Sequence, residues 1–342
     1  MSFRQAIITT LIVIILLGGY FSWNYFSKVF RPLPPPRIYK IGFLLTSKDV
    51  QSDNIKGFKE RMEDLGYKID ENLVYVEKNG GGDNNLILQY AKELNDTGLD
   101  VIIIGSTSAA RALKKLQDEG QLKTKVFFLA AGNPRDFVQN LQSPESFITG
   151  IGEGTVEFVG KRLEFLKELV PNMKKVISVV EKESTNEKLF KEKLAEVSKK
   201  IGVEMVYIDI DTKTPDEILQ KLPLLTKKLG DAYITCPCKS NDIERLAKPL
   251  AAQLLNAGLP SISSEISAGA NLGFTATYSD DRAESGRTGA VLVDKILKGV
   301  PISQISVWFA KDVVLELNLK TAEAVGIKIP DSVKLLASKI YQ

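Results

Sequence analysis

Histidine is absent from this 342-residue sequence, and cysteine occurs only twice, at Cys236 and Cys238. Without histidine there can be no Ser–His–Asp triad, no histidine metal site and no imidazole general base. Two cysteines are too few for a disulfide framework or a four-cysteine zinc site. Because neither a nucleophile–base pair nor a metal-ligand set is visible, we predict that the protein is not an enzyme, with no catalytic residue, metal or cofactor.

An excess of positive charge is also missing. The 45 Lys and Arg nearly balance the 42 Asp and Glu, which leaves a net charge of +3. Nucleic-acid binding depends on clustered positive charge, so we expect no nucleic-acid partner. The 44% hydrophobic and 25% charged residues are globular values. The length suits two lobes of ordinary domain size.

The N-terminus contains one long apolar run, Ala6–Phe26, without a charged residue. As a helix it would extend about 31 Å, close to the hydrocarbon thickness of a bilayer. Aromatic rings, which favour the headgroup layer, gather at its far end: Tyr20, Trp23, Tyr25 and Phe26. We predict an uncleaved transmembrane anchor or signal at residues 1–27, and a cleaved secretory signal is the alternative.

Arg4 and the α-amino group favour a cytoplasmic N-terminus, although Lys28, Arg31 and other basic residues follow the apolar run. Residues 28–37 contain four prolines and are typical of a stiff linker. We therefore predict a single-pass protein of the cell membrane, whose soluble part lies on the extracytoplasmic (periplasmic) side.

From Ile38 onward, β-branched runs alternate with amphipathic helical stretches. The first set of predicted strands is 38–45, 73–77, 100–105, 126–130 and 147–151, with helices 53–65, 85–94 and 109–119. The second set has strands 175–180, 204–210, 231–235, 259–262 and 273–277, with helices 156–169, 187–201, 216–229, 241–257 and 281–297. Such alternation predicts an α/β protein with two doubly wound parallel-sheet lobes.

Ligands of open α/β sheets bind beyond the carboxyl ends of the strands, where helices begin. The loops at these positions are rich in hydroxyl groups: Thr46-Ser47, Ser106-Thr107-Ser108, Ser184-Thr185, Pro237-Cys238-Lys239-Ser240 and Ser263-Ser264-Glu265. Each hydroxyl alone could be an N-cap that needs no ligand. Their convergence on the edges of two sheets favours a polar small-molecule cleft.

Three other motifs have structural interpretations. Residues 150–154 contain three glycines without dinucleotide-loop spacing, so we interpret them as a connection between lobes. Cys236-Pro-Cys238 could be a redox pair or half of a soft-metal site, but small residues at a strand end are the interpretation we favour. The acidic pairs Asp280-Asp281 and Glu181/Glu183 are typical of helix caps.

Several stretches, in this order, resemble a known family: Ile41-Gly-Phe-Leu, Gly57-Phe-Lys-Glu, Gly105-Ser-Thr-Ser-Ala-Ala, Gly132-Asn-Pro, Ile148-Thr-Gly-Ile, Lys161-Arg-Leu-Glu-Phe-Leu-Lys-Glu-Leu-Val-Pro, Gly286-Arg, Ile296-Leu-Lys-Gly, Leu317-Asn-Leu-Lys-Thr-Ala and Gly326-Ile-Lys-Ile-Pro. Together they resemble the ABC-transporter substrate-binding family that includes tryptophan- and tyrosine-binding proteins, which has the type I periplasmic binding fold. The resemblance extends over nearly all of 38–340.

The resemblance implies a two-lobed clamp with three crossovers. Residues 38–152 plus 280–299 would form the first lobe, and 153–279 plus 300–342 the second lobe with the C-terminal helices. It also implies an extracytoplasmic solute receptor that closes on its ligand and docks on an ABC permease. The family's binding positions correspond to Thr46, Ser106, Ser108, Asn133, the Pro237-Cys238-Lys239 loop and Ser264-Glu265, and Thr107 adjoins them.

The sequence departs from the family at three places. The lipid-bearing cysteine is absent, because Tyr20 follows Leu17-Gly18-Gly19. Cys238-Lys239 stand where an acidic or amide residue often follows the proline, and Pro134-Arg135-Asp136 is atypical.

These features leave two candidate functions. The first is a membrane-anchored solute-binding protein of an ABC-type uptake system, with a small polar or zwitterionic solute, such as an amino acid, between its lobes. Ser106 and Ser108 would hold a carboxylate and Glu265 an ammonium group, whereas Lys239 would suit an anion. The alternative is a sensory or accessory subunit that uses the same fold to bind other membrane subunits. Solute, partner and oligomeric state stay open.

Overall fold

The computed structural model describes residues 17–20, 37–46, 52–131, 133–145, 147–152, 155–182, 187–211 and 213–342. The chain divides into two compact units, Met1–Ile38 and Tyr39–Gln342. In the first unit, residues 17–20 are helical. Within the part of the chain that the structure describes, no helix is both long and apolar enough to cross a bilayer. Most of the predicted anchor 6–26 and the linker lie outside the described residues, so both stay predictions.

The second unit contains two sheets. The first has the strand order β11-β5-β4-β3-β1-β2, and all of its strand pairs are parallel. Its strands are β1 (Tyr39–Leu45), β2 (Leu73–Asn79), β3 (Val101–Ile104), β4 (Lys125–Ala131), β5 (Ile148–Gly152) and β11 (Trp308–Phe309). All four residues of β3 are buried, as expected for a strand that helices cover on both faces.

Four helices cover this sheet: α2 (Ser52–Asp64), α3 (Asn84–Asp96), α4 (Thr107–Asp118) and α10 (Arg282–Leu297). Residues Ile102 and Ile104 of β3 pack against α3 and α4, whereas Val101 and Ile103 pack against α2 and α10. The alternation of side chains along each strand therefore divides the first lobe's core into two layers.

The second sheet has the order β13-β12-β10-β9-β8-β6-β7, and β12 runs antiparallel to β10. Its strands are β6 (Lys175–Lys182), β7 (Glu204–Asp211), β8 (Ala232–Ile234), β9 (Ser261–Ser263), β10 (Ala276–Asp280), β12 (Val313–Asn318) and β13 (Lys339–Tyr341). Its helices are α5 (Val159–Leu169), α6 (Glu187–Ile201), α7 (Ile218–Lys221), α8 (Lys239–Asp242), α9 (Glu244–Asn256), α11 (Leu319–Ala324) and α12 (Asp331–Leu335). Helices α5 and α6 cover one face, and α7 and α9 the other. The predicted two-lobed α/β architecture is confirmed.

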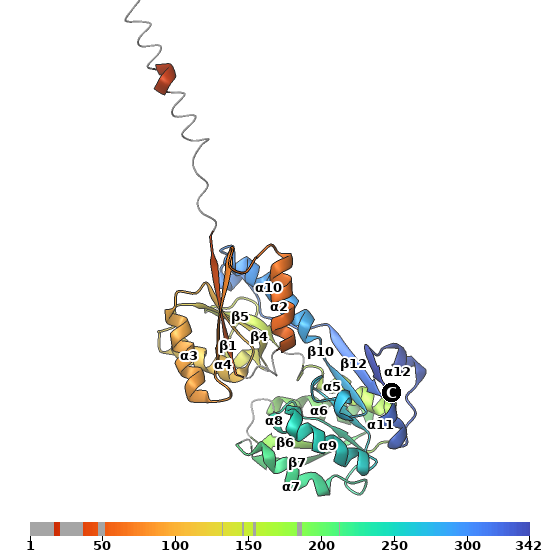
Figure 1. Cartoon of the computed structure of the whole chain (residues 1–342). Helices are drawn as coiled ribbons and strands as arrows, with labels where there is room; N and C mark the ends of the chain where they lie inside the picture. Colours follow the sequence, from red (N-terminus) through yellow and green to blue (C-terminus); the bar gives the residue numbers. More distant parts are fainter. Residues whose placement is uncertain are drawn as a thin grey trace, which may run out of the picture. The chain divides into compact units, whose positions relative to one another are not determined.

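The chain passes between the sheets three times: after β5, from β10 into α10, and from β11 to β12 (Figure 1). One detail differs from the prediction, which placed all of 300–342 in the second lobe. Trp308 instead pairs with Ile151, so β11 extends the first sheet beside β5. The extra strand covers backbone groups that β5 would otherwise leave unpaired at the sheet edge.

Two predicted helices are wrong in extent, and proline and backbone geometry explain why. Residues 216–229 form only short pieces, η2 (Pro215–Glu217), α7 and η3 (Leu222–Leu224), because Pro223 cannot donate a helical hydrogen bond. The predicted helix 241–257 is divided into α8 and α9 by Ile243, whose backbone is extended. The predicted strand 273–277 begins later, at Ala276, since Gly273 adopts a left-handed conformation (φ 107°) and ends η4 (Ala270–Leu272).

Helices α2 and α10 lie side by side, and glycines bring their backbones together (Figure 1). A Cβ atom on Gly286 would lie 2.0 Å from the carbonyl oxygen of Asn54, and one on Gly57 would lie 2.1 Å from that of Ala283. Both positions therefore require glycine. This contact fixes α10 to the first lobe, although α10 begins only two residues after the end of β10 in the second sheet.

Candidate functional site

The first lobe contributes a hydroxyl-rich edge at the carboxyl ends of β1 and β3. Thr46 follows β1 and is half-buried, whereas Ser47 lies outside the described residues. Ser106 follows β3 and is the N-cap of α4: its hydroxyl accepts a hydrogen bond from the Ala109 N–H at 3.2 Å. The Ser108 hydroxyl lies 3.3 Å from that of Ser106. Two predicted residues are thus brought together at a helix N-terminus, which favours an anionic group. The side chain of Thr107 is not among those described.

Asn133 lies beyond the end of β4 and caps a single turn, η1 (Pro134–Asp136). Its side-chain oxygen accepts a hydrogen bond from the Arg135 N–H at 3.3 Å, and its amide donates to Asp136 Oδ1 at 2.9 Å. Burial raises the pKa of Asp136. These contacts of Asn133 are local and suit a structural cap.

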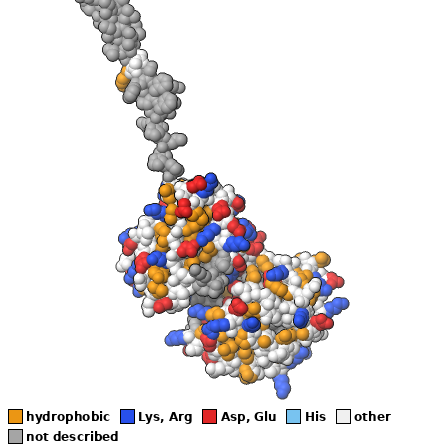
Figure 2. Space-filling model, viewed as in Figure 1, with side chains coloured by type: hydrophobic (Ala, Val, Ile, Leu, Met, Phe, Trp, Pro, Cys, Tyr) orange, Lys and Arg blue, Asp and Glu red, His pale blue; other side chains and the backbone are white. Residues whose placement is uncertain are grey.

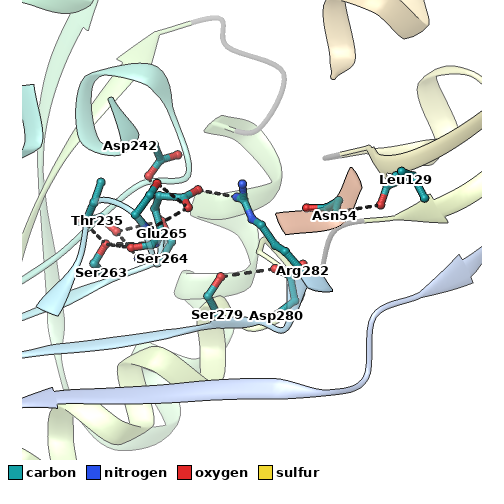
Figure 3. Close-up of polar contacts among 12 residues, drawn as sticks. Asn54, Leu129, Thr235, Asp242, Ser263, Ser264, Glu265, Ser279, Asp280 and Arg282 are labelled. Atoms are coloured by element: carbon teal, nitrogen blue, oxygen red, sulfur yellow. Dashed lines mark hydrogen bonds and ion pairs between the residues drawn. The ribbon is translucent and has the colours of Figure 1, made fainter. Parts of the chain in front are cut away.

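The second lobe contributes a network of buried hydroxyls at the carboxyl ends of β8 and β9 (Figure 3). Ser264 is fully buried, and its backbone N–H donates to Thr235 Oγ1 at 2.8 Å. The Ser264 and Thr235 hydroxyls lie 2.9 Å apart, and Ser264 Oγ donates to Asp242 Oδ1 at 3.3 Å. The network links the loop after β9 to the end of α8, and places Asp242 beside the predicted residue Ser264.

Glu265 forms a buried ion pair with Arg282, the first residue of α10 (Figure 3). The two side chains are only 7% and 11% exposed. The other carboxylate oxygen accepts hydrogen bonds from the Ser267 N–H at 3.3 Å and from the Ser267 hydroxyl at 3.0 Å. Both oxygens of Glu265 therefore have partners within the protein, which changes the role that the sequence suggested for it.

The Cys236–Ser240 segment turns from β8 into α8. Both thiols are free and buried, and burial raises the pKa of Cys236 well above its ordinary value. The Asn241 amide donates to Cys238 Sγ at 3.3 Å, whereas Lys239 is exposed. Below this turn, Glu181 accepts a hydrogen bond from the Ser240 N–H at 2.6 Å. Burial raises the pKa of Glu181, and that hydrogen bond opposes the shift.

Arg162 of α5 was not among the residues predicted from the sequence, and it is fully buried. Its three guanidinium nitrogens have no hydrogen-bond partner among the described residues. The sequence pattern could have revealed this burial, because Arg162 falls on the same helix face as Val159, Leu163 and Leu166. All three of these apolar residues are buried. A charged residue in an apolar stripe indicates a buried charge with a specific purpose.

The family model described as "ABC transporter substrate binding protein" matches residues 43–341. The chain belongs to this family. The resemblance noted in the sequence is therefore confirmed, and the two carboxyl-edge networks belong to a substrate-binding protein. The family is defined by substrate binding, and not by nucleophilic or metal catalysis.

Among similar proteins is a tyrosine-binding protein from Clostridioides difficile, 23% identical over 288 residues, which are 83% of this chain and 80% of the relative. A Streptococcus pneumonia ABC domain solved in complex with L-Trp is 23% identical, with a TM-score of 0.76 over 89% of this substrate-binding protein and 99% of that chain. A ligand-free, open substrate-binding protein with adhesive properties from Clostridium difficile is 22% identical, with a TM-score of 0.72 over 89% of this chain and 100% of its own. These structures establish the shared fold.

Proposed function

We propose that this substrate-binding protein is a membrane-anchored extracytoplasmic receptor that delivers an aromatic amino acid, L-tryptophan or L-tyrosine, to an ABC permease. The solute binds between the carboxyl edges of the two sheets. The binding residues are among those that the sequence suggested: Thr46, Ser106, Thr107, Ser108, Cys238, Lys239 and Ser264. Asn133 and Glu265, whose side chains already have protein partners, position the two edges.

The observation that carries this proposal is the chemistry of the two edges. On the first lobe, Ser106 and Ser108 stand at the N-terminus of α4, where hydroxyls, free N–H groups and the helix dipole all favour a carboxylate. On the second lobe, carboxylates and hydroxyls meet at the ends of β8 and β9. One edge suits an anion and the other a cation, and together they suit a zwitterion. The two relatives whose names mention tyrosine and L-Trp support the choice of an aromatic amino acid.

Thermal unfolding of the purified full-length chain with each amino acid tests the solute class. A ligand at a hundred times its dissociation constant should stabilise the folded state by about 2.7 kcal/mol. We expect a rise in melting temperature with L-tryptophan or L-tyrosine and none with sugars or nucleosides. Absence of a shift with every amino acid would instead support the accessory role, in which the fold binds other membrane subunits.

A bulky substitution tests the position of the site. Ser106→Trp should abolish the ligand-induced shift because the indole would fill the edge beside α4. Ser303→Trp, at an exposed position of the first lobe, is the matched control and should keep the shift. If Ser106→Trp binds like the wild type, the solute does not bind at this edge.

Cell fractionation tests the anchor. We expect the full-length chain to stay with membranes through an alkaline carbonate wash, because Ala6–Phe26 is long enough to span the bilayer. A chain without residues 6–26 should be recovered in the soluble fraction. Release of the full-length chain, shortened at its N-terminus, would indicate a cleaved signal instead.

A further inference from the structure

The ion pair of Arg282 and Glu265 joins one element of each lobe (Figure 3). Arg282 is the first residue of α10, whose apolar side chains, such as Val293 and Ile296, belong to the core of the first lobe. Glu265 follows β9 of the second sheet, and the strand β10 lies between the two residues in sequence. The side chain of Arg282 therefore returns from the first lobe to the second.

Glu265 is fixed to the second lobe by hydrogen bonds of its own loop. Its backbone N–H donates to Ser263 Oγ at 3.1 Å, and this hydroxyl, which is fully buried at the end of β9, donates to the Ala268 carbonyl oxygen at 3.0 Å. Further along the loop, the Ala270 N–H donates to Thr277 Oγ1 of β10 at 2.7 Å. The loop is thus tied to two strands, so the carboxylate moves with the second sheet.

Arg282 is fixed to the first lobe in a comparable way. Gly286, one turn later in α10, lies close to the backbone of Asn54 in α2. The Asp281 carboxylate is the N-cap of α10 and accepts a hydrogen bond from the Glu284 N–H at 2.9 Å. The first turn of α10 therefore moves with the first lobe.

Between these two fixed ends lies the crossing from β10 into α10. The Asp281 N–H donates to the Asp312 carbonyl oxygen at 2.9 Å, in the crossing from β11 to β12. In that crossing, the Ala310 N–H donates to the Gly152 carbonyl oxygen at 3.4 Å, at the end of β5. The three crossings are therefore joined by backbone hydrogen bonds, and a rotation of one lobe against the other has to occur at them. Such a rotation changes the distance between the two charges, because each is fixed to its own lobe.

Separation of these two charges is costly because both side chains are nearly buried. A buried charge that loses its counter-charge destabilises a protein far more than an exposed one does. Only some angles between the lobes keep the guanidinium of Arg282 on the carboxylate of Glu265. The ion pair therefore favours those angles over all others.

We propose that Arg282 and Glu265 are positioning residues that hold the two lobes at one angle, and so keep the Ser106 and Ser264 edges at a fixed separation for the solute without contacting it. The hold on the angle is argued from the protein's own contacts, and only its effect on solute binding rests on the proposed function. Glu265 thus has a role other than the ammonium-binding one that the sequence suggested.

The first test measures the lobe angle in the full-length chain. Nitroxide labels at Ser303→Cys in the first lobe and Glu196→Cys in the second, both exposed positions, report the inter-lobe distance by pulsed dipolar spectroscopy. The native thiols are buried, so the labels should react with the added cysteines. The variant Arg282→Met/Glu265→Gln removes both charges of the pair at once, so it should fold. We expect it to have a wider distance distribution than the wild type.

The second test measures solute affinity by calorimetry. The probes are L-tryptophan and its analogue without the amino group, 3-(indol-3-yl)propionate. If about a third to a tenth of the molecules of the double variant have the angle that binds the solute, the apparent dissociation constant rises by about three- to tenfold. Both probes should weaken by the same factor, because the ion pair acts through the angle and not on the ammonium group.

Two further variants separate this role from a general loss of charge. Arg287→Met/Glu284→Gln is the matched control, because it makes the same two substitutions in a more exposed ion pair within α10. It should leave the distance distribution unchanged and the affinities within about twofold of the wild type. Arg282→Lys keeps a positive charge opposite Glu265, and should keep most of the narrow distribution and of the affinity.

The outcomes separate this inference from the proposed function. If the double variant has the distance distribution of the wild type, the pair does not hold the angle and the inference is overturned. If only L-tryptophan weakens while the analogue binds as before, Glu265 binds the ammonium group itself. A wider distribution with unchanged affinity would refute the effect on solute binding. If the wild type binds neither probe, the proposed function fails, and the distance distributions still decide whether the pair holds the angle.

Discussion

The carboxyl edges of the two sheets differ in their chemistry, although both are built from strands followed by helices. The first lobe's edge at α4 carries hydroxyl groups: Ser106 and Ser108 stand at a helix N-terminus, and the Ser106 hydroxyl is already a cap. The second lobe's edge carries charges: Asp242 accepts a hydrogen bond from the buried Ser264 hydroxyl, and Glu265 pairs with Arg282 of α10. A neutral helix start can bind an anion without a counter-charge, whereas a cation needs a carboxylate held in place. This difference is the basis of our proposal that each lobe binds one end of a zwitterion.

Helix α10, which lies beside α2 in Figure 1, also contacts the two lobes differently. It contacts the first lobe through backbone, where Gly286 and Gly57 allow close approach to α2. It contacts the second lobe through a buried ion pair, Arg282 with Glu265. Charged side chains are mixed in sign over both lobes on the face that Figure 2 shows. The buried pair is therefore distinct from the exposed ion pairs, which contribute little to stability.

The largest expected effect comes from breaking the charged edge. Arg282→Met leaves the Glu265 carboxylate buried without its counter-charge, and should lower the free energy of unfolding by about 3–5 kcal/mol. The double variant Arg282→Met/Glu265→Gln removes both charges and should recover much of that loss. Urea denaturation of the full-length protein measures both. Equal destabilisation by the single and double variants would show that charge is not the cause.

A smaller effect is expected where α10 contacts the first lobe. Gly286→Ala places a Cβ atom against the backbone of α2, and should cost about 1–3 kcal/mol because the helices must separate. Lys295→Ala changes an exposed residue of the same helix and should stay within about 0.5 kcal/mol of the wild type. A neutral result for Gly286→Ala would mean that α2 and α10 are not in backbone contact.

A smaller loss of stability is expected at the hydroxyl groups that begin α4. Ser106→Ala removes the N-cap of α4 and should cost about 1 kcal/mol in the absence of ligand. Ser108→Ala keeps the cap and should cost less, while both variants weaken amino-acid binding. Calorimetric melting without and with L-tryptophan separates the two effects. A larger loss of stability for Ser108→Ala would contradict the assignment of the cap.

The smallest expected effect is a pH dependence of the free energy of unfolding, caused by Glu181. Burial raises the folded-state pKa of Glu181 above its unfolded value, so the folded state binds more protons. The contribution of this group is therefore most favourable at acidic pH, and is lost as the pH rises from the unfolded pKa through the folded one. Glu181→Gln should be more stable than the wild type at pH 7, with a smaller difference at pH 4. Exposed Glu192→Gln should show no such trend.

Much of the fold could be predicted because it depends on local patterns. The four apolar residues of β3 and the amphipathic helix 187–201 appear in the structure with nearly the predicted bounds. The failures were at prolines and turns, where one backbone group decides the outcome. Pro223 limits the predicted helix 216–229 to short pieces, and Gly273 moves the start of β10 from the predicted residue 273 to Ala276. The position of β11 could not be predicted, because a two-residue strand has no pattern of its own and depends on the free edge of β5.

The candidate site divides in the same way. Hydroxyls such as Ser106 and Ser264 could be located from sequence alone, because the carboxyl end of a strand is a local feature and the lobes place these ends at the sheet edges. The partners of the charged residues could not be predicted from the sequence. Glu265 was expected to meet an ammonium group, yet Arg282, seventeen positions later in the chain, reaches it from another element. Arg162 is joined electrostatically to Asp242 and Asp280, which follow it by 80 and 118 positions.

Composition, periodicity and motif order thus predicted the two-lobed α/β fold, the family and the location of the polar loops. Each of these depends on residues that lie close together in the chain. The folded structure alone decided which partner a buried charge has, as the pairing of Glu265 with Arg282 shows. Pairing depends on distances of a few ångströms between residues far apart in sequence, and on burial, which makes an unmatched charge costly. The solute specificity that we propose depends on that second level.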